Sequence, residues 1–301
     1  MNYETLLENL TKKDERFIIM TAENRAAIRN LPSKIGNRFI DTGITEMTLV
    51  GMAAGLALQG RIPIAHSLST FLTMRAFEFI RTDIGIGNLP VKLVGGVPGL
   101  MSEANGPTHQ ALEDISIMRG IPNMRVFCPA DEDDMMICME KILNSPSPYY
   151  IRYNNRKPLY SHSSVFVEGK AEIISMGKDI NILTYGILFS EALETSKLLE
   201  SKGFDTGLIN MRTLKPIDEG IIINILKKSK LTVILEDHFL TGGLFSIVSE
   251  TAMKYNISGK VFPIAFKEKW FKPALYKDIL IYEELTPLLL TNRILKEIEK
   301  I

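Results

Sequence analysis

At 301 residues the chain is longer than a single minimal core requires and suits two domains of ordinary size. Hydrophobic residues make up 46% and charged residues 23% of the sequence, which disfavours a disordered or membrane-spanning protein and favours a globular cytoplasmic one. The 35 basic residues balance 35 acidic ones, so the excess positive charge of non-specific nucleic-acid binders is missing, and we expect neither nucleic acid nor membrane as a partner.

Short apolar runs alternate with longer amphipathic segments through the first half of the chain. The runs are continuously apolar and rich in β-branched residues, as expected of strands buried in a parallel sheet. They cover residues 17–21, 61–67, 90–96, 124–130 and 148–153, and helix-length segments cover 45–60, 71–85, 109–120 and 131–144. This alternation predicts an α/β fold with helices on both faces of the sheet.

The segment 157–178 interrupts this pattern, because it has many polar residues and little helical period. We place the domain boundary there, with a first domain over 1–165 and a second over 176–301. The second half repeats the alternation. Strand-like runs cover 180–186, 204–216 and 231–238, and helical segments cover 190–203, a stretch ending near 229, and 242–255. It predicts a second, smaller α/β domain.

Three segments of the first half carry side chains that could meet a ligand. In the first, a strand runs into a glycine turn and delivers Glu46 at the start of an Ala/Gly-rich helix. The second places Phe71 and Phe77 on one helical face, and the third presents His109 after a Gly-Pro loop. Each feature also has a structural explanation: helix-dipole stabilisation, core packing, and a capping or solvated histidine, respectively.

Taken in order, these segments resemble the C-terminal half of transketolase. The matching sequences are GITE before the Ala/Gly-rich helix, STF, NGPTHQALED, MRGIPNM, CPAD and, in the second half, MRTLKPID. The resemblance runs along almost the whole chain. It implies a larger pyrimidine-binding domain, a smaller transketolase C-terminal domain, and thiamine diphosphate as the cofactor.

The resemblance also implies roles for individual residues. Glu46 is expected to hydrogen-bond N1′ of the cofactor's aminopyrimidine and to activate it, and Phe71 to stack on that ring. Ile44 and Phe77 are expected to complete the apolar wall of the cofactor site. His109 is expected to lie near the substrate oxygens, where it could donate a hydrogen bond to a developing alkoxide.

Further matches and departures concern the substrate. Arg152 corresponds to an arginine that binds the acceptor phosphate, and Asn105 stands in the substrate region where an acidic residue is usual. Val97 occupies the approximate position at which classical transketolases carry a histidine. Glu23 lies near the position at which an aspartate is common in the family. Because the positions of Val97 and Asn105 normally contact sugar hydroxyls, the identity of the ketose donor and the aldose acceptor stays open.

The sequence lacks one motif that the family requires. Members hold the diphosphate through a divalent metal bound by a GDG motif and a following Asn, and no GDG occurs here. We therefore expect no metal ligands on this chain, with Mg²⁺ or another divalent cation on a separate N-terminal subunit. The resulting prediction is an α2β2 heterotetramer that transfers a ketol unit between sugars or sugar phosphates.

Three alternatives remain at this point. The chain could be the β subunit of a 2-oxoacid dehydrogenase, or part of a deoxyxylulose phosphate synthase-like enzyme, which shares the GPTH and IPNM sequences. It could also be a non-catalytic paralogue, as the changes at Val97 and Asn105 would allow. His238, in the LEDH sequence of the second half, is expected to be structural.

Overall fold

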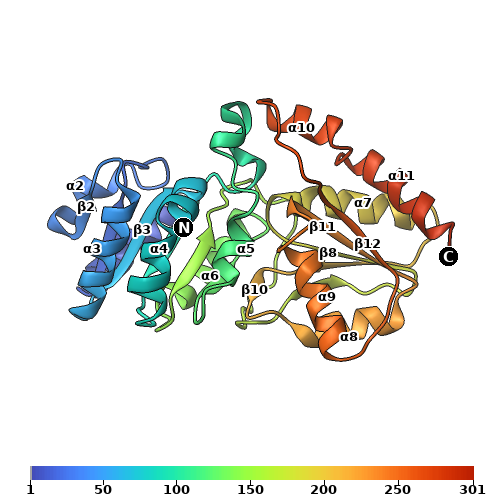
Figure 1. Ribbon diagram of the computed structural model, residues 1–301, viewed down its shortest axis with the longest axis horizontal. Helices are drawn as coiled ribbons and strands as arrows, with labels where there is room; N and C mark the ends of the chain where they lie inside the picture. The colour runs from blue at the N-terminus through green and yellow to red at the C-terminus, as the bar shows by residue number, and fades with distance from the viewer. Residues whose placement is uncertain (1) are drawn as a thin grey trace.

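The computed structural model describes residues 2–301, which fold into two α/β units lying side by side (Figure 1). The helices and strands of the first unit are α1 (Tyr3–Lys13), β1 (Phe17–Thr21), α2 (Leu31–Ile35), β2 (Phe39–Asp41), α3 (Glu46–Leu58), β3 (Ile62–Leu68), α4 (Phe77–Phe79), β4 (Lys92–Gly96), α5 (Asp114–Arg119), β5 (Arg125–Phe127), α6 (Glu132–Leu143) and β6 (Tyr149–Arg152). Shorter helical turns cover Gly36–Arg38, Phe71–Arg75, Ile80–Gly85 and Leu100–Thr108.

The second half of the chain supplies the remaining elements. They are β7 (Glu172–Ser175), β8 (Ile180–Thr184), α7 (Phe189–Ser201), β9 (Thr206–Asn210), β10 (Thr213–Lys215), α8 (Glu219–Lys228), β11 (Leu231–Phe239), α9 (Leu244–Lys254), β12 (Val261–Phe266), α10 (Tyr276–Tyr282) and α11 (Pro287–Ile298), with a short turn at Gly186–Leu188.

Both units are built on mostly parallel sheets. The first sheet has seven strands in the order β10-β5-β6-β4-β3-β1-β2, and the second has five in the order β12-β11-β8-β9-β7. Only the edge strands β10 and β7 pair antiparallel with their neighbours among the described strands. The structure therefore confirms the predicted fold class of two α/β domains.

The hydrophobic core is continuous between the two units. On one face of the first sheet, α1, α2 and α6 bury their apolar side chains. On the other face, α3 and α5 belong to one cluster that continues through β10 to α8 and α9 of the second unit. The opposite face of the second sheet is covered by α7, α10 and α11. Within residues 2–301, none of the helices is long and apolar enough to cross a membrane.

Three expected elements differ in the structure. The helix expected over 71–85 is divided into two π-helical turns around the short α4, a geometry common at functional sites. The helix expected from 109 begins only at Asp114, because the backbone of Ala111 is paired with Gly99 in an isolated antiparallel bridge. The run 204–216 divides into β9 and β10, which join different sheets, so the second half contributes an edge strand to the first sheet.

A buried guanidinium connects the two units. Arg152, the last residue of β6, is 2% exposed. It bonds Asp114 Oδ1 at 2.6 Å, where α5 begins, and Asp237 Oδ1 at 2.7 Å, in β11 of the second unit. Burial is the largest single influence on Asp114 and opposes its ionisation, but the charge of Arg152 and the hydrogen bonds from Arg152 and Tyr150 together lower the pKa of Asp114. Each charge in this group is thus tolerated only because the others are present.

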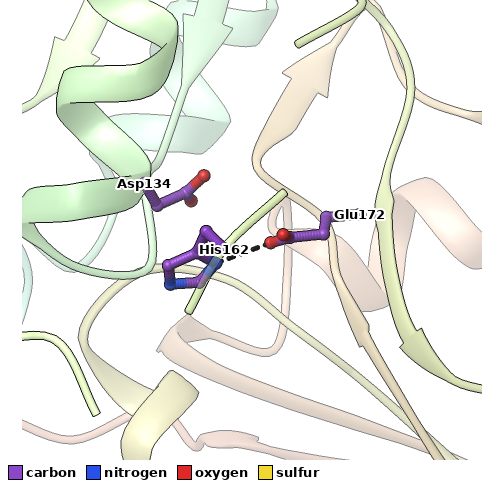
Figure 2. Close-up of side chains that lie close together, drawn as sticks. All are labelled: Asp134, His162 and Glu172. Carbon is purple, nitrogen blue, oxygen red and sulfur yellow. Dashed lines mark hydrogen bonds and ion pairs between the residues drawn. The ribbon is translucent and has the colours of Figure 1, made fainter. Parts of the chain in front are cut away.

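A second group of buried charged side chains stabilises the contact between the units, and Figure 2 shows three of its members. We call Asp131, Asp134, His162, Glu172 and Arg212 the His162 cluster. The imidazole bonds Asp131 Oδ2 at 2.9 Å and Glu172 Oε2 at 2.7 Å, and Arg212 pairs with Glu172 at 2.6 Å and Asp134 at 3.1 Å. Burial disfavours the charged imidazole, yet these carboxylates raise the pKa of His162 to about 10.

Removing the guanidinium should destabilise the fold. Arg152→Met leaves the carboxylates of Asp114 and Asp237 buried without a cation, so we expect a loss of about 3–5 kcal/mol in the free energy of unfolding, measured by urea denaturation. Lys12→Met is the control, because Lys12 is exposed and its ion pair is with Glu8 on the same helix; stability should barely change. Equal losses in both variants would contradict this role of Arg152.

The His162 cluster should give stability a characteristic pH dependence. Because the pKa of His162 rises from 6.5 to about 10 on folding, its contribution is complete below 6.5 and is lost as the pH rises toward 10. His162→Gln should therefore be less stable than the wild type by roughly 1.5–3 kcal/mol in mildly acidic buffer. That difference should shrink with increasing pH in parallel urea titrations. A difference that is independent of pH would refute the charged state of His162.

Candidate active site

The candidate site lies at the carboxyl edge of the first sheet. Strands β1, β3, β4 and β6 are parallel, so the loops that follow them open on the same edge. Ligands of open α/β sheets bind at this edge. The segment Leu100–Thr108, which precedes His109, also packs against α10 of the second unit. Pro273, just before α10, lies close to Gly106. Figure 1 shows α10 in the second unit.

Glu46 is the first residue of α3 and its carboxylate is buried. The preceding turn needs Gly43, which has a φ of 72°. Glu46 is 1% exposed; Ser67 donates to its Oε1 at 3.3 Å and Arg75 to its Oε2 at 2.7 Å. Each oxygen of this buried carboxylate therefore has one hydrogen-bond donor, a neutral hydroxyl on one side and a cationic guanidinium on the other.

Phe71 and His109 lie beside this carboxylate. The guanidinium carbon of Arg75 is 4.3 Å from the centre of the Phe71 ring, and the His109 ring meets Phe71 edge-on at 5.1 Å. We call Glu46, Ser67, Phe71, Arg75 and His109 the Glu46 cluster. The structure thus brings together three residues that the sequence singled out.

The other predicted site residues occupy different surroundings. Ile44 is 69% exposed two residues before Glu46, whereas Phe77 is half-buried and packs against the core. Asn105 is exposed, in the turns before His109. Arg152 was predicted to bind an acceptor phosphate, but it is 2% exposed and four of its five N–H donors are bonded to Asp114, Asp237 and the Ala111 carbonyl.

Ser67 and Arg75 are functional candidates that the sequence analysis missed. Arg75 ends the π-helical turn that begins at Phe71, which places both side chains beside Glu46. Its position four residues after Phe71 was the available signal, since such residues are neighbours on a helix. Ser67 follows His66 on β3, and no local pattern indicates that its hydroxyl faces a carboxylate 21 residues earlier.

The Glu46 cluster fits an aminopyrimidine. Arg75 presents a flat cationic group that lies over Phe71 and donates to Glu46. An aminopyrimidine protonated at the ring nitrogen needs the same two contacts, an aromatic face and a buried carboxylate. The side chains therefore suit the pyrimidine end of thiamine diphosphate once Arg75 has left its contacts with Glu46 and Phe71.

One group of described residues has metal-ligand spacing. The nearest ligand atoms of Asp134, His162 and Glu172 lie within 4.8 Å of one another (Figure 2). However, both imidazole nitrogens are bonded to carboxylates, and Arg212 pairs with the acidic side chains. The pKa of His162 is raised to about 10, so a metal ion would have to displace the imidazole proton before it could bind here.

Two family models, both of transketolase domains, match this chain. The model for the transketolase pyrimidine-binding domain matches residues 2–159, and that for the transketolase C-terminal domain matches residues 169–284. The 6-deoxy-6-sulfo-D-fructose transketolase subunit SqwH of Clostridium sp. (strain MSTE9) is 35% identical over 252 residues, covering 82% of this chain and 78% of that protein. The putative transketolase C-terminal section of Methanocaldococcus jannaschii is 34% identical, covering 99% and 95%.

Other relatives are longer than this chain. The 1-deoxy-D-xylulose-5-phosphate synthase of Dictyoglomus thermophilum is 36% identical over 249 residues, which are 80% of this chain but 40% of the synthase. Transketolase of Campylobacter jejuni shares the fold, with a TM-score of 0.79 at 20% identity, and this chain spans 45% of it.

A split-gene protein matches the structure along its whole length. The structure of a split-gene transketolase described as an inactive β4 tetramer has a TM-score of 0.88 at 29% identity and covers 99% of this chain and 97% of that one. The family models, the full-length relatives and the fold agree. The chain therefore belongs to the transketolase family and carries its pyrimidine-binding and C-terminal domains.

Proposed function

We propose that this chain is the C-terminal subunit of a split transketolase and transfers a two-carbon ketol unit from a ketose donor to an aldose acceptor. The observation that carries the proposal is the buried carboxylate of Glu46 beside the ring of Phe71, with Arg75 where an aminopyrimidine would bind. Thiamine diphosphate, when bound, supplies the electron sink that this transfer requires.

The side chains of this chain have separable tasks in that reaction. Glu46 accepts a hydrogen bond from the pyrimidine N1′ and so holds a proton there, while Phe71 orients the ring. His109 Nδ1 lies 2.9 Å from the Thr108 hydroxyl. A hydroxyl that donates to Nδ1 fixes the tautomer with the proton on Nε2, from which His109 can donate to a substrate oxygen.

The diphosphate and its metal belong, in this proposal, to a separate N-terminal subunit in an α2β2 assembly. The absence of a GDG motif and the end-to-end match to a C-terminal section support a divided enzyme. The split-gene relative, described as an inactive tetramer of β chains, is consistent with a C-terminal chain that needs a partner for turnover.

A synthase-like activity is the second candidate. It is favoured by the identity of 36% with a deoxyxylulose phosphate synthase, although this chain spans only 40% of that protein. The two reactions transfer different units. The name of the synthase indicates a 1-deoxy product, which lacks the hydroxyl on C1, whereas the product of ketol transfer keeps that hydroxyl. Product analysis with a ketose donor separates them.

Replacing Glu46 should abolish turnover and leave cofactor binding largely intact. Glu46→Gln keeps a hydrogen-bonding group of the same size but cannot hold the proton at N1′ as a carboxylate does, so kcat should fall by about 10²–10⁴-fold. Turnover of the complex with its partner is measured by ketol transfer, and the bound cofactor by its absorbance after denaturation. Glu78→Gln, an exposed glutamate on α4, is the control. Unchanged kcat in Glu46→Gln would contradict the mechanism.

The chain alone should be inactive. Affinity purification of this chain from its native cells should bring down one further transketolase-family subunit, and only that complex should bind thiamine diphosphate with Mg²⁺ and cleave a ketose. Calorimetry and a ketol-transfer assay on both preparations decide the matter. Tight cofactor binding and turnover by the isolated chain would show that the division of the active site is wrong.

A further inference from the structure

A small pocket opens beside the Glu46 cluster at the carboxyl edge of the first sheet. Its volume is about 110 Å³, room for roughly four water-sized groups. Its walls come from the loops after β1, β4 and β6, from β3 and from the Leu100–Thr108 turns. They include the side chains of Asn24, Ala27, His66, Val97, Met101 and Tyr153. Because Ala26 and Asn155 at its rim are exposed, the pocket is open to ligands.

Two elements connect this pocket to the Glu46 cluster. On β3, His66 lines the pocket while the next residue, Ser67, donates to Glu46. Consecutive side chains of a strand point to opposite faces of the sheet, so a ligand that reaches both the pocket and Glu46 must pass over the carboxyl end of β3. Met101 lines the pocket on the segment that ends at His109. A substrate with its reacting end at Glu46 and His109 can therefore extend its far end toward the pocket.

The pocket carries no formal charge. None of its ten lining residues is Lys, Arg, Asp or Glu. Burial lowers the pKa of His66 to about 4, and its ring nitrogens are bonded to Tyr3 and the Met20 carbonyl, so it is neutral at physiological pH. Phosphate and sulfonate groups are bound in proteins by cationic side chains or clustered backbone N–H donors. An anion placed here would lose hydration without a compensating charge.

Three arginines that follow strands at this edge are already committed elsewhere. Arg25, after β1, is paired with Asp41. Arg75, after β3, is paired with Glu46. Arg152, at the end of β6, is fully enclosed between two aspartates. None of these three arginines is among the residues that line the pocket.

The pocket wall is held in a demanding conformation. Val97 has a φ of 54°, which is a rare and strained value for a β-branched residue. Next to it, a Cβ on Gly96 would lie 2.7 Å from Asn24 Nδ2, so the loops after β4 and β1 are in close contact. Surrounding contacts must therefore fix Val97 in place, and the pocket has a defined shape.

We propose that this pocket receives the uncharged end of the sugar, so that the enzyme acts on unphosphorylated substrates in preference to sugar phosphates. Asn24 and Tyr153 offer hydrogen bonds to hydroxyl groups, and Ala27, Val97 and Met101 contact the carbon chain. The inference rests on the proposed function, because it concerns the substrate of the same site.

The experiment uses the complex of this chain with its diphosphate-binding partner. Hydroxypyruvate is the fixed donor; its ketol unit is transferred and its carboxylate leaves as carbon dioxide. D-Erythrose and D-erythrose 4-phosphate are the matched acceptors. We expect kcat/KM at least about tenfold higher for D-erythrose, since each unmet charge contact in a buried site costs a factor of this order. Equal use of both acceptors, or preference for the phosphate, would overturn the proposal.

Paired variants separate charge from size. Val97→Lys places a cation in the pocket and should shift the preference at least about tenfold toward D-erythrose 4-phosphate. Val97→Gln adds comparable length without charge and should leave the preference near that of the wild type. Equal shifts in both variants would mean that charge in this pocket does not select the substrate, and the proposal would fail.

A binding measurement distinguishes failure of the pocket from failure of the proposed function. If neither acceptor is used, ketol transfer itself is refuted. The ¹³C-methyl NMR signal of Met101, assigned with Met101→Leu, then reports on the pocket directly. Titration with D-erythrose should move this signal, and D-erythrose 4-phosphate should move it only at concentrations at least about tenfold higher. An unmoved signal with D-erythrose would refute the pocket.

Discussion

The ion pairs of Arg152 are the interaction on which the arrangement of the two units depends. One guanidinium at the end of β6 bonds the first residue of α5, the carbonyl of Ala111 and a carboxylate of β11. A buried charge is costly unless all its partners are present. The end of the first sheet, the segment that carries His109 and the central part of the second unit are therefore fixed together.

The same constraint shapes the Glu46 cluster. A carboxylate that is 1% exposed requires donors, and Ser67 and Arg75 provide them. Arg75 is itself 42% exposed in its side chain, so it can leave at a smaller cost than the enclosed Arg152. A planar donor that binds Glu46 and stacks on Phe71 would replace Arg75 without leaving the carboxylate unpaired. The site can thus remain intact before and after it is filled.

Committed charges also explain why the pocket beside the cluster is neutral. The cations of the sheet edge stabilise Asp41, Glu46, Asp114 and Asp237 instead of facing the opening. The His162 cluster uses two more cations between the units. The distribution of charge that stabilises the fold is thus also the basis of the proposed preference for an uncharged substrate.

The sequence by itself determined the fold class and the residues that mark the site. Continuous apolar runs specify buried parallel strands because this signal is local, whereas Glu46, Phe71 and His109 were expected at the site from the resemblance to transketolase. The tertiary structure alone decided which charges meet. Arg152 lies 85 residues from Asp237, and Arg212 lies 78 from Asp134, so neither pair leaves a periodic trace in the sequence. The burial that converts Arg152 from a possible phosphate ligand into a structural cation exists only once both units are packed together.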